Sequence, residues 1–580
     1  MSTAQFSFPL NVFARMLSVR EGRVDYLHFA VFEDGQRDVL RAQERASELL
    51  WQALPPPCRL LEVGIGLGTT LGQLLRAGYA ARGITPEQAQ IDVARQRQGE
   101  GLPLTLSRLE DFQQDAGQWD ALLFQESAQY IEPMALFESA ERLLHAGPAT
   151  LVVMDEFALR RDAEDHGGLH LLPAFIALAQ RFGWRLSQHT DLSRQVQPTL
   201  DYLIDAAHAM RADLMRELRL DEATMVGLVA ALERARALYR AGVYGYAVLR
   251  FERAQPASDR LLSLGPDQAE SVRGLFEAVF GHPLSAAEWQ WKYGDGRGRA
   301  LGLQREERLL AHYGALTRRV RFHGREVAAC QVCDVMVAAQ ARSNLARSGP
   351  LHRVTASFLE AQIGWGRPHL IGYGFPTQRA MAAAQHLGLY APVDGMEAFS
   401  WTPLRGSAGA TVQALADEDL APGKPAAALV DQAWAAMVAA LPEQTLGVRD
   451  AAWLRHRYCR HPRFRYQVLL VRRRWTRRLL GVVVLRQHEH HLEWVDLVGA
   501  PAQLEVLLAV ARNRAHELGL AVLEAWITHS QAGRFESLAD GTCKRRALDI
   551  AVPANVHSPG PSVEDQRGRW WLMAGDTDFR

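Results

Sequence analysis

Residues 60–68 bring together an apolar run, one carboxylate and three glycines at alternate positions, namely Glu62, Gly64, Gly66 and Gly68. This order predicts a buried strand that ends at a turn where a ligand touches the backbone, because a β-carbon there would hold the ligand away. Leucines at helical spacing in residues 69–76 predict a helix that starts at the turn and points its N-terminus at the ligand. A glycine-rich strand end without a ligand is the alternative interpretation of the same residues.

The spacing of the glycines separates two classes of nucleotide-like ligand. A dinucleotide fold requires G-x-G-x-x-G, whereas this chain has G-x-G-x-G with Glu62 two residues before the first glycine. That pattern resembles motif I of the class I S-adenosyl-L-methionine (SAM)-dependent methyltransferases. The resemblance implies a Rossmann-like domain over residues 1–252 and SAM as its cofactor, held by Glu62, Gly64, Gly66 and Gly68.

Two further strand ends extend this resemblance. Gly83–Gln88 is similar to the GVTxSxEQ segment of the branch that contains cyclopropane-fatty-acid synthases and tocopherol methyltransferases. The resemblance implies that Thr85 and Gln88 lie beside the SAM ribose, where many relatives have a carboxylate. Relatives also place an aspartate against the adenine amine after the third strand. This chain departs from that pattern, and Leu109 is the residue we assign to the cofactor site there.

The acceptor side of the site is implied by residues 125–131, which resemble the ESxxHx turn of small-molecule methyltransferases. Gln125 is assigned to the cofactor. The histidines of that turn are replaced here, so Glu126 or Tyr130 takes the role of base, or no base is needed. His28 belongs to a segment that folds over the acceptor in the resembled branch, and a purely structural histidine is the alternative.

Methyl transfer from SAM needs little acid–base chemistry, because the sulfonium is already activated and the protein mainly positions donor and acceptor. A base is required only where the nucleophile keeps its proton at neutral pH. The missing histidines therefore favour an amine or a thioether acceptor slightly, and nitrogen, oxygen and sulfur nucleophiles all stay open.

A second resemblance begins after the predicted linker 253–259. Between residues 267 and 390 the predicted order is helix, antiparallel strands, helix, strand and helix, as in the GCN5-related N-acetyltransferase (GNAT) fold. Family members hold the CoA pyrophosphate on a glycine loop, and the loop here has Leu345 at the first glycine position. The resemblance implies a site for acetyl-CoA or another acyl-CoA at Arg342, Arg347 and Gly349. The alternative is a GNAT-like scaffold without acyl transfer.

The same order of predicted elements returns near the end of the chain, after a second predicted linker at residues 404–427. The expected fold class is therefore α/β, with a Rossmann-like class I methyltransferase domain at 1–252 followed by two GNAT-like α+β domains at 263–403 and 429–580. One member of such a pair can be catalytic while the other is structural.

The composition is that of an ordinary globular protein: 580 residues, 48% hydrophobic, 22% charged, with zero formal net charge. A neutral chain has no global field that favours nucleic acid or a membrane surface, and no apolar stretch is long enough to span a bilayer. The arginine-rich residues 455–478 are interpreted as a solvated face. We expect a cytoplasmic protein with a small-molecule acceptor, and oligomeric state is left open.

The cysteines and histidines predict no metal site. Five scattered cysteines argue against a disulfide framework. Cys330 and Cys333 fall in a predicted strand, where residues three apart face opposite sides, which disfavours zinc. The histidines of residues 488–491 stand at a predicted turn and point apart.

The leading functional hypothesis is a small-molecule methyltransferase fused to an acyltransferase region that acts in the same pathway. The alternative keeps the methyltransferase but makes the GNAT-like pair a non-catalytic module that binds the acceptor or a carrier protein. The degraded glycine loop favours this alternative.

Overall fold

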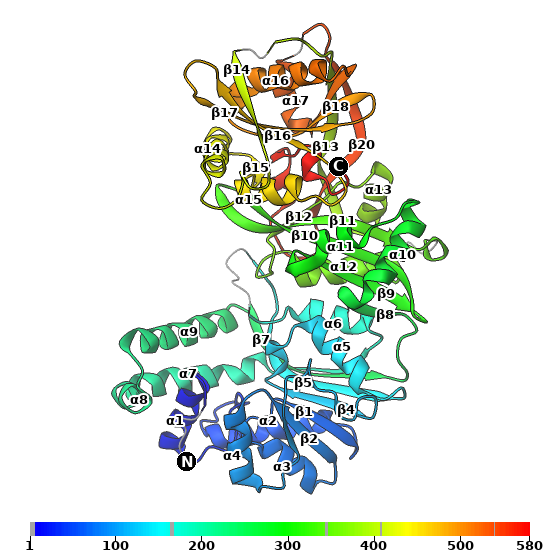
Figure 1. Cartoon of the computed structure of the whole chain (residues 1–580). Helices are drawn as coiled ribbons and strands as arrows, with labels where there is room; N and C mark the ends of the chain where they lie inside the picture. Colours follow the sequence, from blue (N-terminus) through cyan, green and yellow to red (C-terminus); the bar gives the residue numbers. More distant parts are fainter. Residues whose placement is uncertain (1–5, 163–167, 343–345, 407–408, 539) are drawn as a thin grey trace. The chain divides into compact units, whose positions relative to one another are not determined.

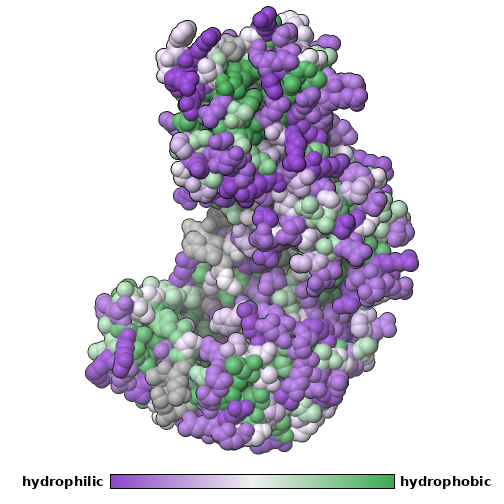
Figure 2. Space-filling view, viewed as in Figure 1, coloured by the Kyte–Doolittle hydropathy of each residue, from purple (hydrophilic) through white to green (hydrophobic). Residues whose placement is uncertain are grey.

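The chain folds into two compact units in the computed structural model: unit 1, Met1–Arg260, and unit 2, Leu261–Arg580 (Figure 1). The structure describes residues 6–162, 168–342, 346–406, 409–538 and 540–580. The visible face of each unit is mainly hydrophilic (Figure 2). In the described part of the chain, no helix has both the length and the apolar character needed to cross a membrane.

Unit 1 is built on a seven-stranded sheet with the order β3-β2-β1-β4-β5-β7-β6. Strands β1 to β5 run parallel to their neighbours, and β7 is antiparallel to both β5 and β6. The strand order reverses between β1 and β4, which is where open α/β sheets bind ligands. The strands are β1 (Arg59–Val63), β2 (Ala80–Thr85), β3 (Leu104–Leu106), β4 (Ala121–Gln125), β5 (Ala149–Ala158), β6 (Arg185–Asp191) and β7 (Tyr244–Arg253).

Helices pack against this sheet and also form a layer of their own. Helix α7 contacts α1 and α9, and Figure 1 shows α7, α8 and α9 extending away from the sheet with α1 beside them. The helices are α1 (Leu10–Glu21), α2 (Val39–Ala53), α3 (Thr69–Arg76), α4 (Gln88–Gln98), α5 (Pro133–Leu143), α6 (Leu172–Arg181), α7 (Ser193–Ala209), α8 (Arg211–Leu218) and α9 (Glu222–Arg240).

Unit 2 contains two sheets, each of seven strands. The first comprises β8 (Arg260–Leu264), β9 (Gly298–Arg305), β10 (Arg308–Phe322), β11 (Arg325–Val337), β12 (Ile371–Tyr373), β15 (Thr445–Gly447) and β21 (Trp570–Trp571). The second has the order β14 (Ala410–Leu415), β16 (Gln467–Arg473), β17 (Leu479–Gln487), β18 (His491–Val498), β19 (Val522–Thr528), β13 (Tyr390–Trp401) and β20 (Lys544–Asn555). The helices of the unit are α10 (Ala269–Phe280), α11 (Ala286–Tyr293), α12 (Pro350–Gln362), α13 (Gln378–His386), α14 (Pro425–Ala440), α15 (Ala451–Leu454), α16 (Leu504–Glu517), α17 (Ala532–Glu536) and α18 (Val563–Gln566).

The two halves of unit 2, residues 261–403 and 404–580, exchange strands. Strand β13 of the first half lies between β19 and β20 of the second half and pairs antiparallel with both. In return, β15 of the second half pairs with β10, and β21 extends the first sheet beyond β15. The expected linker 404–427 is wrong, because it contains β14 and the start of α14. The division into domains at 263–403 and 429–580 stays a prediction, since residues 261–580 form one compact unit.

Two buried arginines connect distant segments within the second half of unit 2. Arg449 is fully buried and donates hydrogen bonds to Asp496 Oδ1, at 2.8 Å, and to Asp576. Arg457 is also buried and donates to the carbonyl oxygens of Gly575 and Thr577, at 3.1 and 3.0 Å. The expectation that residues 455–478 form a solvated face is therefore wrong at Arg457, whose charge serves to bind the backbone of a distant segment.

Candidate functional site

Unit 1 has a cavity of about 550 Å³ at the carboxyl ends of β1, β2 and β4. Most of the residues expected to bind SAM or the acceptor lie on its wall, although they come from distant parts of the sequence. Those on the wall are His28, Glu62, Gly64, Gly66, Thr85, Leu109, Gln125, Glu126 and Tyr130. Gly68 and Gln88 are not among the lining residues.

The three glycines after β1 serve three different purposes. A β-carbon on Gly64 would lie 2.5 Å from Ser127 Cβ, so this glycine allows the turns after β1 and β4 to approach. A β-carbon on Gly68 would lie 2.7 Å from Ala94 Cβ, so this glycine allows α3 to pack on α4. Only Gly66 would point a β-carbon into open space, and its φ of +51° disfavours other residues. Gly66 is therefore where the backbone faces the cavity directly.

Glu62 contributes a carboxyl group with unused hydrogen-bonding capacity. Its side chain is 1% exposed, and its Oε2 atom has no hydrogen-bond partner among the described residues. Burial raises the pKa of Glu62 to about 8. A buried acceptor atom without a partner is costly, so the geometry suits a ligand that brings a donor, such as an amino group.

On the ribose side, the glutamine that faces the cavity is Gln90 rather than the expected Gln88. Thr85 Oγ1 donates to Gln90 Oε1, at 2.8 Å, and both residues line the cavity. Gln88 instead donates to Asp92 Oδ1, at 2.7 Å, along the exposed face of α4. Gln90 was missed because α4 begins at Gln88, so the residue that faces the cavity lies two positions later than the matched motif suggests.

Glu126 stands immediately after β4 in the left-handed conformation, with φ of +54°. Its Oε1 accepts hydrogen bonds from the backbone N–H of Phe29 and from the hydroxyl of Tyr246, both at 2.6 Å. Burial is the main reason that the pKa of Glu126 rises to about 8, and the neighbouring carboxyls of Glu156 and Asp155 raise it further. Such a group can exchange a proton near neutral pH.

Glu126 belongs to a buried cluster of three carboxyls. Asp155 accepts hydrogen bonds from two backbone N–H groups, and burial raises its pKa to about 8. Glu156 accepts from the Tyr239 hydroxyl, at 2.8 Å, and burial raises its pKa to about 7. Among the described residues, no arginine, lysine or histidine forms an ion pair with any of the three. The cluster therefore consists of carboxyls that are largely protonated at neutral pH and gain negative charge as pH rises toward about 8, with no positive charge beside them among the described residues.

The other two candidate catalytic residues lie differently. His28 Nδ1 donates to the Phe29 carbonyl, at 2.8 Å, its Nε2 lies 3.4 Å from Ser47 Oγ, and burial lowers its pKa to about 4. It is thus a neutral side chain with both nitrogens engaged, which fits a structural role. The side chain of Tyr130 is 80% exposed at the cavity wall, and a phenol keeps its proton at neutral pH. Glu126 is the group with the chemistry of a base.

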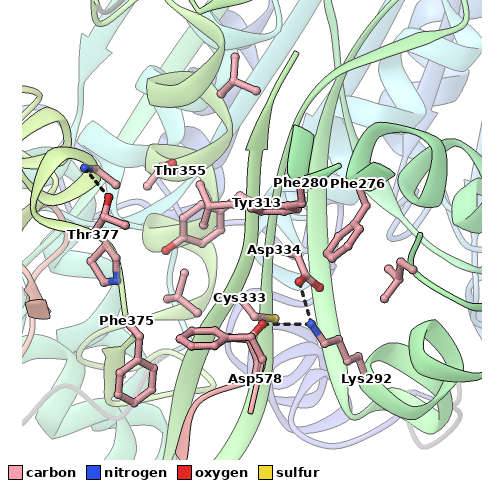
Figure 3. A pocket seen from close by; sticks show the side chains of 18 of the residues that line it. Phe276, Phe280, Lys292, Tyr313, Cys333, Asp334, Thr355, Phe375, Thr377 and Asp578 are labelled. Carbon is pink, nitrogen blue, oxygen red and sulfur yellow. Dashed lines mark hydrogen bonds and ion pairs between the residues drawn. The ribbon is translucent and has the colours of Figure 1, made fainter. Parts of the chain in front are cut away.

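A second cavity, of about 970 Å³, lies in unit 2 between β11, the end of β12, α12 and α13 (Figure 3). On one wall, Lys292 Nζ donates to Asp334 Oδ1, at 2.7 Å, and to Asp578 Oδ2, at 3.0 Å. Tyr293 donates to the other oxygen of Asp334, at 2.7 Å. Burial alone would raise the pKa of Asp334, but Lys292 outweighs it and holds that pKa below its usual range. Cys333, Asp334 and Asp578 lie close together, and Lys292 is bonded to both carboxyls. Its single charge compensates Asp334, whereas burial raises the pKa of Asp578.

Of the three residues expected to hold CoA, only Arg342 lines this cavity. Arg342 lines the cavity, and its Nε donates to the Val337 carbonyl, at 2.9 Å. Gly349 caps the N-terminus of α12, and neither it nor Arg347 is a lining residue. Leu345, at the expected glycine position, lies outside the described residues. The polar group around Lys292 was missed because its members are far apart in the sequence.

Two family models match the chain. Residues 61–152 match the model of a methyltransferase domain, and residues 261–381 match the model of an acetyltransferase (GNAT) domain. The chain contains one domain of each kind. The expected α/β fold class, with a methyltransferase domain followed by a GNAT-like domain, and the expected cofactors SAM and an acyl-CoA agree with these two matches; the second GNAT-like domain at 429–580 stays a prediction. No protein with a curated description matches the sequence.

Solved structures show weaker likenesses. A protein from Enterococcus faecalis V583, named a probable N-acyltransferase, is 12% identical over 52% of this chain and 72% of its own, with a TM-score of 0.41. Mycolic acid cyclopropane synthase, in complex with SAH and CTAB, is 17% identical over 43% of this chain and 97% of its own, with a TM-score of 0.36. Geranyl diphosphate C-methyltransferase from Streptomyces coelicolor A3(2) is 18% identical over 43% of this chain and 99% of its own, with a TM-score of 0.32.

Proposed function

We propose that this chain is a transferase with two active sites. Unit 1 transfers a methyl group from SAM to the nitrogen of a small amine, and the first half of unit 2 transfers an acyl group from an acyl-CoA, in the same pathway. The observation that carries the first assignment is the cavity at the reversal of strand order, where Gly66 exposes backbone and Glu62 keeps an unpartnered oxygen.

The cavity residues of unit 1 fit SAM. Gly66 lets a ligand approach the backbone, Glu62 Oε2 can accept from the ligand's amino group, and Thr85 with Gln90 offers polar atoms for a ribose. The volume of about 550 Å³ is in the range of ligand pockets. SAM supplies an activated methyl group, so the chain's own residues have to position the acceptor and remove its proton.

Glu126 is suited to that proton transfer. An amine that enters as its ammonium form must lose a proton before its nitrogen can act as a nucleophile. The carboxylate of Glu126 accepts this proton, while Phe29 N–H and the Tyr246 hydroxyl hold the carboxyl group in place. The neighbouring Asp155 and Glu156 do not line the cavity and have no cationic partner among the described residues, so the charge that they gain as pH rises would favour a cationic acceptor beside Glu126.

A glycine variant tests the cofactor assignment. In Gly66→Asp, a side chain enters the space where the backbone faces the cavity, although aspartate is among the residues that best tolerate a positive φ. We expect isothermal titration to show SAM binding weakened by about a hundredfold or more, since the contact is steric. Gly78→Ala is the matched control, because Gly78 also has a positive φ, of +90°, but does not line the cavity. Unchanged SAM binding by Gly66→Asp contradicts the assignment.

Acyl transfer by unit 2 is supported by the GNAT match and by Arg342 at the large cavity. The second candidate is a GNAT-like module that binds the acceptor or a carrier protein without catalysis. It is favoured because Arg347 and Gly349, two of the residues expected to hold CoA, do not line the cavity. Titration of the full chain with acetyl-CoA separates the two: heat at micromolar ligand, reduced in Arg342→Gln, supports the acyltransferase. No heat at high micromolar acetyl-CoA supports the module.

A further inference from the structure

The second half of unit 2 forms part of the wall of the cavity of the first half. His461, Arg463, Phe464 and Arg486 line the same cavity as Arg342 and Thr377 of the first half. The cavity is thus shared between the two halves, and the part contributed by the second half lies outside the family-model match, which ends at residue 381.

Among the described residues, three arginines that line this cavity form no ion pair with a carboxylate. Lys292 is bonded to Asp334 and Asp578, and Arg463 Nη1 lies 3.7 Å from Glu288 Oε1. Among the described residues, no carboxylate lies within ion-pair distance of the remaining lining cations, which are Arg342, Arg379 and Arg486. The first two belong to the half that matches the GNAT family, and their charges suit the phosphates of CoA.

Arg486, on β17, is the remaining cation and belongs to the second half. Its guanidinium carbon lies 3.7 Å from the ring centre of Phe464, so the aromatic ring fixes the plane of the group. Nη1 is buried without a hydrogen-bond partner. Glu493, its cross-strand neighbour on β18, is engaged by His488 Nε2 at 3.0 Å instead. A buried N–H of a charged group without an acceptor is unfavourable, and a ligand oxygen would relieve that cost.

His461 adds a neutral donor to the same wall. Its Nδ1 accepts hydrogen bonds from the backbone N–H groups of Arg463 and Phe464, both at 3.1 Å, so Nε2 carries the ring proton. Burial lowers the pKa of His461 to about 3, with the charges of Arg457 and Arg486 contributing, so the ring is neutral at physiological pH. The wall therefore offers a fixed guanidinium and an N–H donor.

We propose that this wall recognises the anionic group, a carboxylate or a phosphate, of an amine that is the acyl acceptor, and that Arg486 is its principal contact. The inference rests on the proposed acyl transfer. In that reaction the amine nitrogen forms a C–N bond to the thioester carbonyl carbon, the C–S bond breaks, and one N–H proton ends on the leaving thiolate. The products are an amide and the thiol of CoA. The second half of unit 2 is thus the acceptor-recognition part of the acyltransferase.

The test compares matched acceptors on the full chain with acetyl-CoA, by thiol release and mass spectrometry. One pair of mixtures contains amino acids and their carboxamides, and a second pair contains O-phosphoethanolamine and ethanolamine. We expect the anionic members to react at least about tenfold faster, the loss typical of a missing charged hydrogen bond. The preferred pair tells a carboxylate from a phosphate. Equal rates for anionic and neutral amines, or no reaction of any anionic amine when acetyl-CoA binds, overturn the proposal.

Single substitutions test whether Arg486 causes the preference for anionic amines. Arg486→Gln is expected to lower kcat/KM for the anionic amine by about tenfold or more, mainly through KM, with Arg486→Lys partly restoring it. Acetyl-CoA affinity should be unchanged. Arg478→Gln is the matched control, because Arg478 is exposed just before β17 and does not line the cavity. Activity of Arg486→Gln equal to that of Arg478→Gln overturns the proposal.

A binding measurement distinguishes failure of this inference from failure of acyl transfer. If acetyl-CoA does not bind, the acyltransferase assignment is wrong. The anion site is then tested separately, with inorganic phosphate as the only ligand. In an Arg342→Gln/Arg379→Gln background, we expect broadening of the phosphate ³¹P resonance that disappears when Arg486→Gln is added. Broadening that survives Arg486→Gln, or that is absent from the start, overturns the site.

Discussion

Buried carboxyls have opposite surroundings in the two units. In unit 1, Glu126, Asp155 and Glu156 gather without a cation, and burial raises their pKa values to about 7 or 8. In unit 2, Asp334 is bonded to Lys292, and Asp496 to Arg449. A carboxyl paired inside the chain holds the structure together, whereas an unpaired one stays available for a ligand or a proton. The same residue type is thus structural in one unit and poised for chemistry in the other.

The largest effect should come from removing a cation of unit 2. Arg449→Met leaves Asp496 buried without its cation and leaves Asp576 with only Arg318, 3.5 Å away, so we expect the free energy of unfolding to fall by about 3–5 kcal/mol. Urea denaturation of the full chain, followed by tryptophan fluorescence, measures it. The exposed Arg478→Gln should change this free energy by less than about 0.5 kcal/mol. A similarly small loss in Arg449→Met would break the comparison.

Removing a carboxyl from unit 1 should affect catalysis strongly and stability little. Glu126→Gln keeps the shape of the side chain but removes the base, so we expect methyl transfer to an amine to slow by about a hundredfold or more. Stability at neutral pH should be nearly unchanged, because the wild-type carboxyl is mostly uncharged there and the glutamine oxygen can still accept from Phe29 N–H and Tyr246. Turnover by mass spectrometry and thermal denaturation on the same sample give both quantities. A variant that is less stable and still active contradicts the role assigned to Glu126.

The pH dependence of methyl transfer should reflect the titration of the carboxyl cluster around Glu126. The base form of Glu126 accumulates as pH rises through about 8, so kcat should rise by about tenfold per pH unit below that value and level off above it. Since Asp155 and Glu156 titrate nearby, the apparent pKa belongs to the cluster as a whole. The measurement is kcat from pH 6 to 10, with Glu126→Gln expected to lose this rise. A flat wild-type profile argues against proton transfer by Glu126.

Glu126 and Asp155 of unit 1 should contribute to stability with the opposite pH dependence to Asp334 of unit 2. The folded pKa values of Glu126 and Asp155 lie above their ordinary ones, so their stabilising contribution is complete below pH about 4 and is lost as pH rises to about 8. The pKa of Asp334 is lowered, so its contribution is present at neutral pH and is lost in acid. Each carboxyl changes stability by at most about 1.4 kcal/mol per pH unit. Hydrogen exchange resolved by peptide, comparing wild type with Glu126→Gln and with Asp334→Asn, isolates each contribution in the full chain, and parallel pH slopes of the two differences would contradict the comparison.

The smallest effect concerns the hydroxyl that holds Glu126. The Tyr246 hydrogen bond stabilises the carboxylate form and so lowers the pKa of Glu126. Tyr246→Phe should therefore move the apparent pKa of kcat upward by about one unit, with little change in the plateau rate. Tyr244→Phe is a neighbouring control outside this hydrogen bond. A lower plateau without a shift would mean that Tyr246 acts on packing alone.

Much of unit 1 could be predicted from the sequence because its signals are local. The strand, glycine turn and helix of residues 59–76 lie where the pattern places them, and the ends of β1, β2 and β4 meet at one cavity. Gln90 could not be predicted, since helix register decides which glutamine faces inward. The carboxyl cluster was only partly foreseen, because Glu156 depends on the length of β5 and on Tyr239 from a distant helix.

Unit 2 was harder to predict because its decisive contacts are non-local. Lys292 meets Asp578 from the far end of the unit, and nothing in the sequence near either residue indicates this pairing. The exchange of β13 is equally hidden, because neither this strand nor its pairing with β19 and β20 was predicted from the sequence. Arg486 lines the same cavity as Arg342 although the two lie far apart in the sequence, so the recognition role that we propose for the second half could be inferred only from the folded chain.

The position of β13 between β19 and β20 has a consequence for synthesis of the protein. Ser400 pairs with Lys544, and Tyr390 with Asn555, so β13 leaves the ribosome long before either of its partners exists. At roughly 5–20 residues per second, the nascent strand waits on the order of ten seconds with both edges open. Unpaired edges of this kind attract other strands. We therefore expect a chaperone to bind the first half of unit 2 until β19 and β20 have been synthesised.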